Sequence, residues 1–322
     1  MTRLLASALV AALILCAGSA SAQSYPSRPV KMIVAFPPGG ATDIVARLVS
    51  QKLSEMWGHQ VLVDNRAGAS GTIGTDVVAK SPADGYTMFM GTMGNLTANP
   101  ALYHNLTFDV AHDLAPVTLV VAVNFVMVTH PSFPPKTVRE LIALAKERPG
   151  QINYASSGAG GAPHLGAELF KGMAGVNLQH IPYKGSGPSF TDLLGGQVSL
   201  TIDSLAQALP YIKTGRLRAL AVTGAKRASM LPEVPTMAEA GVPGYELTNW
   251  FGLVVPAGTP RDIVTRINAD VVKILKMPDV RERLFGMATE PVGNTPEEFG
   301  AFMKSETAKW ARVIKEAGIT AE

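Results

Sequence analysis

The stretch that decides the fold runs from Val30 to Asp43 and reads VKMIVAFPPGGATD. Its first part, Val30–Phe36, is a mostly apolar run of strand length. Pro37-Pro38-Gly39-Gly40 ends that run, and the following region, Thr42–Trp57, has the spacing of a helix. The apolar residues of this region fall on one stripe: Ile44, Val45, Leu48, Val49, Leu53 and Met56. The stretch therefore predicts a buried strand, a glycine-rich turn and a helix.

The same unit occurs a second time in the middle of the chain. Ile152–Ala155 predicts a short strand, and Ser156–His164 (SSGAGGAPH) is a second glycine-rich turn. A helical pattern follows, with apolar residues at Leu165, Leu169, Phe170 and Met173. Either turn alone is equally well explained as a tight connection. Two matching turns favour a common site.

Apolar runs of strand length alternate with helical patterns along most of the chain. The further predicted strands are Val61–Asp64, Thr87–Gly91, Leu178–Tyr183, Val198–Asp203, Leu217–Thr223 and Gly252–Pro256. Further helices include Gly74–Lys80 and Val138–Lys146. Such alternation predicts an α/β fold with mainly parallel sheets flanked by helices.

The last third of the chain is predominantly helical. Thr259-Pro260 is expected to open one helix, with the threonine as its cap and the proline at its first position. Asp279–Phe285 is the core of a second helix. Thr295–Glu298 forms a capping box for a third, which runs to about Ala317 before Gly318. We expect these helices to pack on the first part of the chain, because few strands accompany them.

This arrangement predicts two lobes that share the chain unequally. We place the crossings between them near Val121–Asn124 and Leu247–Trp250. The first lobe then comprises residues 23–123 plus 249–322, and the second comprises residues 124–248.

Residues 1–22 predict a secretory signal peptide. An arginine precedes the apolar run Leu4–Leu15, and small residues follow it, with Ala20 and Ala22 in an A-x-A cleavage site. The mature chain would begin at Gln23 and reside in the periplasm.

The only cysteine of the chain, Cys16, lies within this predicted signal peptide. A mature chain without cysteine has no disulfide, thiolate nucleophile or Cys-ligated metal. Cys16 follows Leu15 rather than the small residue typical of a lipoprotein signal, which favours a soluble product over a lipid-anchored one. The net charge of +3, without a local cluster of Lys and Arg, argues against nucleic acid as a partner.

The sequence matches the common motifs for nucleotide, dinucleotide and metal binding poorly. Neither turn matches G-x-x-x-x-G-K-[ST], and Pro163 stands where a dinucleotide fingerprint has its third glycine. His104 and His112 lie near Asp109 and Asp113, but the two histidines are too far apart to share a helix face. We therefore expect no cofactor and no metal.

The two turns have the chemistry of an anion site. Glycine lets main-chain N–H groups approach a ligand closely, and the first turn of a helix has unpaired N–H donors at the positive end of its dipole. The dipole alone contributes about 0.3–2 kcal/mol per helix, so direct hydrogen bonds must supply most of the affinity. Two such turns facing each other would hold a carboxylate between the lobes.

The candidate ligand-binding residues come from both turns and from neighbouring strand ends. Phe36 is equally well a stacking partner or a core residue, and His164 is either a ligand contact or a packed histidine. Asp203 is an acceptor for a ligand amine or hydroxyl, or the cap of a helix that begins near Leu205. Lys184 is more simply explained as a solvated side chain. The full set is Phe36, Pro38, Gly39, Gly40, Ala41, Thr42, Asp43, Thr92, Asn95, Ser157, Gly158, Gly160, Gly161, His164, Tyr183, Gly185, Ser186 and Asp203.

A periplasmic hydrolase or lyase is the competing class. The chain has no G-x-S-x-G elbow and no H-E-x-x-H motif. Ser157 and His164 are the only serine–histidine pair near the expected cleft. A sensor that presents its ligand to a receptor would share the same pocket and differ only in its partner.

Several ordered motifs resemble one known family. They are YPSRPV (Tyr25–Val30), FPPGG (Phe36–Gly40), DNRAGA (Asp64–Ala69), PADGYT (Pro82–Thr87), PYKG (Pro182–Gly185), WFG (Trp250–Gly252) and PAGTP (Pro256–Pro260). With them the whole mature chain resembles the Bug-type periplasmic solute-binding proteins of tripartite tricarboxylate transporters.

The resemblance implies a two-lobed "Venus flytrap" whose two turns hold a ligand carboxylate, partly through water. It implies capture of a small organic acid, a di- or tricarboxylate or an aromatic carboxylate, and delivery to a membrane permease of the tripartite tricarboxylate type. The motifs do not choose among these acids. We expect a monomer without catalytic residues that closes about the two chain crossings when the ligand binds.

Overall fold

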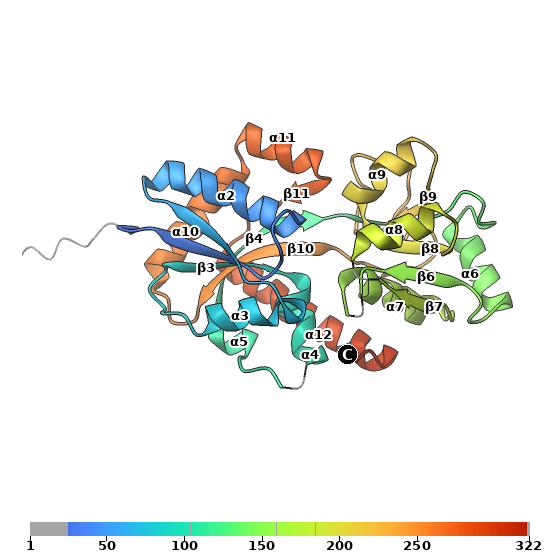
Figure 1. The fold of residues 1–322 in the computed structure, drawn as a ribbon, viewed down its shortest axis with the longest axis horizontal. Coiled ribbons are helices and arrows are strands. Elements are labelled where there is room, and N and C mark those ends of the chain that lie inside the picture. The colour runs from blue at the N-terminus through green and yellow to red at the C-terminus, as the bar shows by residue number, and fades with distance from the viewer. Residues whose placement is uncertain (1–24, 104, 159, 184, 321–322) are drawn as a thin grey trace, which may run out of the picture.

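The computed structural model describes residues 25–320 apart from His104, Ala159 and Lys184. Two α/β lobes lie side by side, each built on one mixed sheet with helices packed around it (Figure 1). This confirms the two-lobed α/β class. The predicted signal peptide, residues 1–22, lies outside the described residues.

The first lobe contains a six-stranded sheet in the order β11-β4-β10-β3-β1-β2. Its strands are β1 (Val30–Val34), β2 (Val61–Asn65), β3 (Thr87–Thr92), β4 (Leu114–Val123), β10 (Asn249–Pro256) and β11 (Thr289–Pro291). Its helices are α2 (Ala41–Trp57), α3 (Thr72–Ala79), α4 (Asn99–Leu102), α5 (Val110–Asp113), α10 (Arg261–Leu275), α11 (Pro278–Gly286) and α12 (Pro296–Ala317), with short helical turns η1 (Ala69–Gly71) and η2 (Gly94–Ala98).

The second lobe contains a five-stranded sheet in the order β7-β6-β8-β5-β9. Its strands are β5 (Phe125–Thr129), β6 (Asn153–Ser156), β7 (Gln179–Pro182), β8 (Leu200–Ser204) and β9 (Arg218–Val222). Its helices are α6 (Val138–Glu147), α7 (Ala162–Ala174), α8 (Ser186–Leu194) and α9 (Leu205–Lys213).

Strand direction differs from the expectation of mainly parallel sheets. The pairs β1–β2, β1–β3, β6–β7 and β6–β8 are parallel, and all four involve the strand that leads into a glycine-rich turn. The pairs made by β10, β4, β11 and β5 with their neighbours are antiparallel. Among the named strands, parallel pairing is therefore confined to the neighbours of β1 and β6, and both sheets are mixed. Strand direction depends on non-local connections, which an apolar run in the sequence does not reveal.

The two lobes are joined where β4 meets β10. β4 ends at Val123 in the first sheet, and β5 begins at Phe125 in the second, so Asn124 alone separates them. The chain returns at Asn249, which starts β10 and pairs with Val123. The two connections therefore lie side by side as neighbouring antiparallel strands (Figure 1).

The C-terminal helix α12 contributes a third link. It packs on β4, η2 and α4 of the first sheet's lobe and also on α7 of the other lobe, beneath the connecting strands in Figure 1. The expectation that the last helices pack on the first lobe is met by α12 but is incomplete, because α12 also packs on the second lobe. On its inner face the buried carboxylate of Glu306 accepts hydrogen bonds from the indoles of Trp310 (2.9 Å) and Trp250 (3.3 Å). Because Trp250 lies in β10, this cluster ties α12 to a connecting strand.

Of the helix caps predicted in the last third of the chain, the one of α12 is confirmed and the one of α10 is wrong. The capping box of Thr295 and Glu298 is present at the start of α12, and Gly318 ends that helix in the left-handed conformation. The predicted cap Thr259 is wrong, because its hydroxyl donates to the carbonyl of Pro256 (2.7 Å) in the preceding turn. Pro260 is the N-cap of α10 and makes no side-chain cap hydrogen bond.

Gly252 provides a test of the packing between β10 and α12. A Cβ at this position would overlap the ring of the buried Phe299. We expect Gly252→Ala to lower the free energy of unfolding by about 1–3 kcal/mol, the usual cost of overpacking a core. Gly172→Ala is the matched control, because a Cβ there meets nothing within 4 Å inside helix α7. This change should raise stability by about 0.5–1 kcal/mol. Urea titration measures both, and a stable Gly252→Ala variant would contradict the packing described.

Candidate functional site

A cleft of about 770 Å³ lies between the lobes and is lined from both sides. Ten of the predicted residues line it: Phe36, Ala41, Thr42, Thr92, Ser157, Gly158, Gly160, Gly161, Ser186 and Asp203. Eight predicted residues lie outside the lining: Pro38, Gly39, Gly40, Asp43, Asn95, His164, Tyr183 and Gly185. Another hollow, of about 890 Å³ between α7 and α12, contains neither glycine-rich turn, so the cleft is the candidate site.

The first glycine-rich turn leads into α2, whose start has no side-chain cap and lies at the cleft. Gly40 is the N-cap in an extended conformation (φ −75°, ψ 165°) and no side chain caps the helix. Gly39 has φ +87°, a left-handed conformation that favours glycine. Its N–H donates to Oδ2 of Asp43 (2.9 Å), four residues later. The first-turn residues Ala41 and Thr42 line the cleft.

Asp43 stabilises this turn through its hydrogen bond with Gly39 and does not line the cleft. Its carboxylate also accepts hydrogen bonds from Nε of Arg47 (2.9 Å) and Nδ2 of Asn65 (2.9 Å). Burial opposes ionisation, but these hydrogen bonds and that from Gly39 outweigh it and lower the pKa of Asp43 to about 2. Both carboxylate oxygens of Asp43 are therefore engaged by other residues of the protein, and its direct contact with a ligand stays a prediction.

The second turn repeats this geometry with different side chains. Gly161 is the N-cap of α7 in the same extended conformation (φ −70°, ψ 162°), again without a side-chain cap. Gly160 has φ +72°, and its N–H donates to Nδ1 of His164 (3.0 Å), four residues later. His164 thus takes the place that Asp43 has in the first turn. His164 is buried and does not line the cleft, which agrees with its interpretation as a packed histidine, and its direct contact with a ligand stays a prediction.

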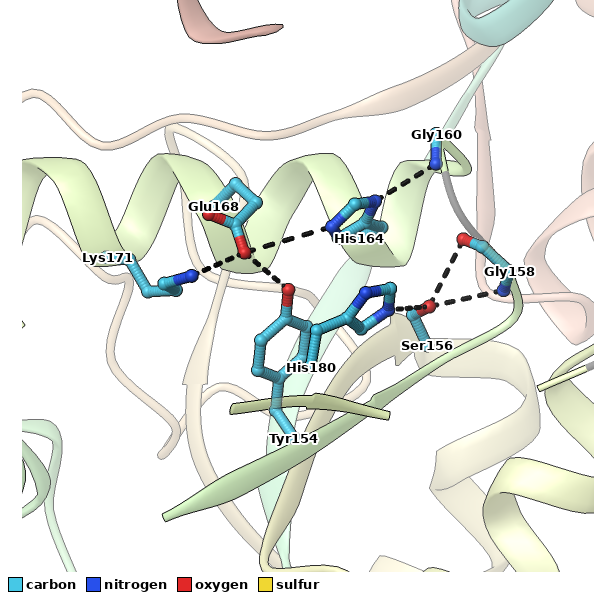
Figure 2. A network of polar contacts seen from close by, with 8 residues as sticks. All are labelled: Tyr154, Ser156, Gly158, Gly160, His164, Glu168, Lys171 and His180. Carbon is cyan, nitrogen blue, oxygen red and sulfur yellow. Dashed lines mark hydrogen bonds and ion pairs between the residues drawn. The ribbon is translucent and has the colours of Figure 1, made fainter. Parts of the chain in front are cut away.

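A buried polar network stands behind the second turn (Figure 2). The ring of His164 stacks on that of His180 at 3.9 Å, and Nε2 of His180 forms a 2.6 Å hydrogen bond with Oγ of Ser156. Oγ of Ser156 in turn contacts the carbonyl and the N–H of Gly158. Gly158 and Gly160 are therefore held by the side chains of Ser156 and His164, neither of which lines the cleft.

The protonation state of His164 follows from this network. Burial, reinforced by the neighbouring His180, lowers the pKa of His164 to about 4. The imidazole is therefore neutral at neutral pH, accepts at Nδ1 from Gly160 and carries its proton on Nε2. Nε2 lies 3.8 Å from Oε1 of Glu168, which is also bound by the hydroxyl of Tyr154 (2.6 Å) and Nζ of Lys171 (2.7 Å) (Figure 2).

The two helix starts offer unequal numbers of main-chain donors. The first N–H groups of a helix have no intrahelical acceptor and lie at the positive end of its dipole. In α2 the first two positions, Ala41 and Thr42, both have an N–H. In α7 the second position is Pro163, which has none. We infer that α2 contributes more hydrogen bonds to an anion than α7 does.

Asp203 is the only charged residue among the described residues that line the cleft. It lies at the end of β8, is 2% exposed, and accepts hydrogen bonds from Oγ of Ser186 (2.7 Å) and from the N–H of Ser204 (2.7 Å). Burial raises the pKa of Asp203 to about 6, against the lowering effect of these two hydrogen bonds. Ser204 is the N-cap of α9 without a side-chain cap bond, so the prediction of Asp203 as the helix cap is wrong.

Three further candidates have other partners. Asn95 is fully buried behind Thr92, whose N–H donates to Oδ1 of Asn95 (2.7 Å). The hydroxyl of Tyr183 donates to Oδ2 of Asp192 (2.6 Å). Gly185 is the N-cap of α8; its N–H donates to the carbonyl of Ser157 (3.1 Å), and it does not line the cleft. Lys184 and His104 lie outside the described residues.

Within the described part of the chain, no three His, Cys, Asp or Glu side chains are grouped to hold a metal ion.

The cleft also includes residues that the sequence analysis missed. The main additions are Ser70, Asn99, Leu102, Tyr103, Gln207 and Asn249. Ser70 has φ +51°, and its carbonyl accepts from Nδ2 of Asn99 (3.0 Å). A Cβ on Gly160 would lie 2.9 Å from Cδ1 of Leu102, so the second turn touches the opposite lobe here. Ser70 follows the DNRAGA motif directly, and that position is the signal that could have identified it.

The helices among the described residues are all too short or too polar to cross a lipid bilayer.

Comparison with known proteins adds an independent line of evidence. Residues 45–319 match the sequence model of the tripartite tricarboxylate transporter family receptor. Protein BugT of Bordetella pertussis is 41% identical over 322 residues, which is 99% of this chain and 98% of that protein.

Two solved structures have the same fold. The structure of Rhodopseudomonas palustris Rpa4515 with adipate is 42% identical, covers 92% of this chain and 99% of its own, and has a TM-score of 0.81. MatC (Rpa3494) from Rhodopseudomonas palustris with bound malate is 31% identical, covers 90% of this chain and 100% of its own, and has a TM-score of 0.77. The match to the family model and the similarity over nearly the whole chain show that this protein belongs to the tripartite tricarboxylate transporter receptor family.

Proposed function

We propose that this protein is a periplasmic receptor that binds a small organic carboxylate in the cleft and delivers it to a membrane permease of the tripartite tricarboxylate type. One observation carries the proposal: the uncapped starts of α2 and α7 come from opposite lobes and border the same cleft. Main-chain N–H groups at helix starts bind anions. The adipate and malate bound by the two relatives above support a carboxylate as that anion.

The geometry around His164 supports a protein that binds its ligand without catalysing a reaction on it. A serine nucleophile needs a histidine nitrogen that accepts its proton. Nδ1 of His164 already accepts from Gly160, and Nε2 faces Glu168. His164 therefore has no free acceptor nitrogen for Ser157. This favours a receptor over a hydrolase, and we propose no catalytic residue.

The proposal includes closure of two lobes about the adjacent connections at Asn124 and at Leu247–Trp250. Residues 23–123 plus 249–322 would form one lobe and residues 124–248 the other. A ligand that contacts both helix starts stabilises the closed form, because only that form brings both sets of donors to it. We further propose that residues 1–22 direct the chain to the periplasm and that it acts there as a monomer.

Removal of a single N–H donor tests the anion site. Ala41 is the first residue of α2, where proline is well tolerated, and Gly40 before it has the extended conformation that proline requires. Ala41→Pro should weaken carboxylate binding by about 10- to 100-fold, the effect of losing one hydrogen bond to a charged group. Isothermal titration calorimetry measures the change.

The matched control is Ala41→Gly, which keeps the N–H and should bind nearly as tightly as the wild type. Melting temperatures of both variants verify that the helix still forms. Wild-type affinity in a folded Ala41→Pro protein would remove the start of α2 from the site.

A ligand screen tests the function itself. A carboxylate present at about 100 times its Kd should stabilise the fold by about 2.7 kcal/mol. Thermal-shift measurements with mono-, di- and tricarboxylates and aromatic acids should therefore identify at least one stabilising acid, while the corresponding amides have no effect. Stabilisation by amides and acids alike would argue against an anion site, and so would a lack of response to every acid.

A further inference from the structure

The side chain of His164 can hold the second glycine-rich turn in only one of its two neutral forms. Nδ1 accepts the N–H of Gly160 at 3.0 Å, so this nitrogen carries no proton and the proton lies on Nε2. In the other tautomer an N–H on Nδ1 would face the N–H of Gly160, and both donors would lack an acceptor. The geometry of the turn therefore depends on the tautomer of His164.

The carboxylate of Glu168 lies on the Nε2 side of this ring (Figure 2). Its Oε1 is 3.8 Å from Nε2 of His164, which is too long for a hydrogen bond but close enough for a substantial electrostatic effect in a buried site. An ionised carboxylate accepts hydrogen bonds and donates none, so it favours a proton on the nitrogen that faces it. Glu168 follows His164 by four residues in α7, a spacing that places both side chains on one face of the helix.

Two further residues hold the carboxylate of Glu168 in this position. The hydroxyl of Tyr154 in β6 donates to Oε1 at 2.6 Å, and Nζ of Lys171 donates to the same oxygen at 2.7 Å. The side chain of Glu168 is only 8% exposed. A buried ion pair is weak evidence for stabilisation, because the cost of removing the charges from water offsets their attraction. What the arrangement provides is a carboxylate fixed at the Nε2 edge of His164.

The imidazole of His164 has a single proton to place. Burial lowers its pKa to about 4, an effect that His180 and Lys171 reinforce and Glu168 opposes, so the ring is neutral at neutral pH. His180 in β7 stacks on the ring at 3.9 Å with an angle of 9° between the two planes. It therefore contacts the face of the imidazole, whereas Glu168 lies at the edge where the proton is held.

Building on the proposed receptor function, we propose that Glu168 is a positioning residue for ligand binding: it fixes the Nε2–H tautomer of His164 and so keeps the second glycine-rich turn in the form that binds a carboxylate. Glu168 does not line the cleft and acts through His164 and Gly160. Enzymes use a carboxylate in the same way to select the tautomer of a functional imidazole. The effect is the same for every carboxylate that the cleft accepts.

Glu168→Gln tests this role, because it keeps the size of the side chain and removes its preference for a donor. The amide can turn its NH2 group toward Nε2 and thereby favour the Nδ1–H tautomer. Nitrogen NMR at neutral pH should place the proton of His164 on Nε2 in the wild type and at least partly on Nδ1 in the variant. Calorimetry with adipate or malate, or with the acid found by the thermal-shift screen if neither binds, should show about 3- to 10-fold weaker binding.

A second substitution separates positioning from a general structural effect. His164→Asn keeps an acceptor near the place of Nδ1, because the side-chain oxygen of asparagine accepts whatever group stands at position 168. In this background Glu168→Gln should change the affinity by less than about twofold, because the two changes act on the same step. An equal loss of affinity in both backgrounds would mean that Glu168 acts on the fold and not through His164.

Glu306→Gln is the matched control for the loss of a buried glutamate. Glu306 is also buried and pairs with a lysine three residues later, Lys309, at 2.7 Å. Its other partners are two indole N–H groups instead of a histidine. Glu306→Gln should therefore lower the melting temperature and leave the tautomer of His164 unchanged.

The outcomes separate this inference from the proposed function. If His164 carries its proton on Nδ1 in the wild type, or if a folded Glu168→Gln variant binds with unchanged affinity, Glu168 is not a positioning residue and the receptor function stands. Should that variant fail to fold, Glu168→Asp provides the same test, because it withdraws the carboxylate from Nε2 by one methylene group and should also weaken binding. If no carboxylate of any kind binds to the wild type, the receptor function and the inference both fail.

Discussion

The structure depends on two main-chain hydrogen bonds, from the N–H of Gly39 to Asp43 and from the N–H of Gly160 to His164. Each bond closes a turn of positive φ and presents the start of the following helix without a side-chain cap. An uncapped helix start is normally a defect, because its first N–H groups lack acceptors. At the edge of a cleft the same unpaired N–H groups are the feature on which the proposed anion site rests.

The two turns reach one geometry by different chemistry. In the first, an ionised carboxylate is held by Arg47 and Asn65. In the second, a neutral imidazole is stacked on His180 and faces Glu168. The shared requirement is an acceptor four residues after the glycine, and both an Asp oxygen and a neutral His nitrogen meet it. The negative charge of Asp43 is offset by Arg47, so its presence near the start of α2 is compatible with an anion in the cleft.

Paired strands and one long helix connect the two lobes that contain these turns. β4 and β10 leave the first sheet as paired antiparallel strands, and α12 spans beneath them to reach α7. Glu306 ties α12 to Trp250 at the start of β10 through buried indole hydrogen bonds. On the cleft side, Leu102 of the first lobe approaches Gly160 of the second, so the lobes meet at the turn itself. The second glycine-rich turn is therefore close to side chains of both lobes.

Local sequence patterns were enough to predict the two repeated units and the family. Glycine at positions 39 and 160 and the apolar stripes after them are local signals, and they placed both strand–turn–helix units within a few residues of where they lie. Which polar groups line the cleft became clear only from the folded structure. Asp43 and His164 sit inside the motifs yet are engaged by glycine N–H groups, and Asn95 is buried behind Thr92. Asp203 becomes the one charged group among the described lining residues only because β8 ends at the cleft. Such assignments depend on contacts between residues far apart in the chain, and on burial, which no local pattern encodes.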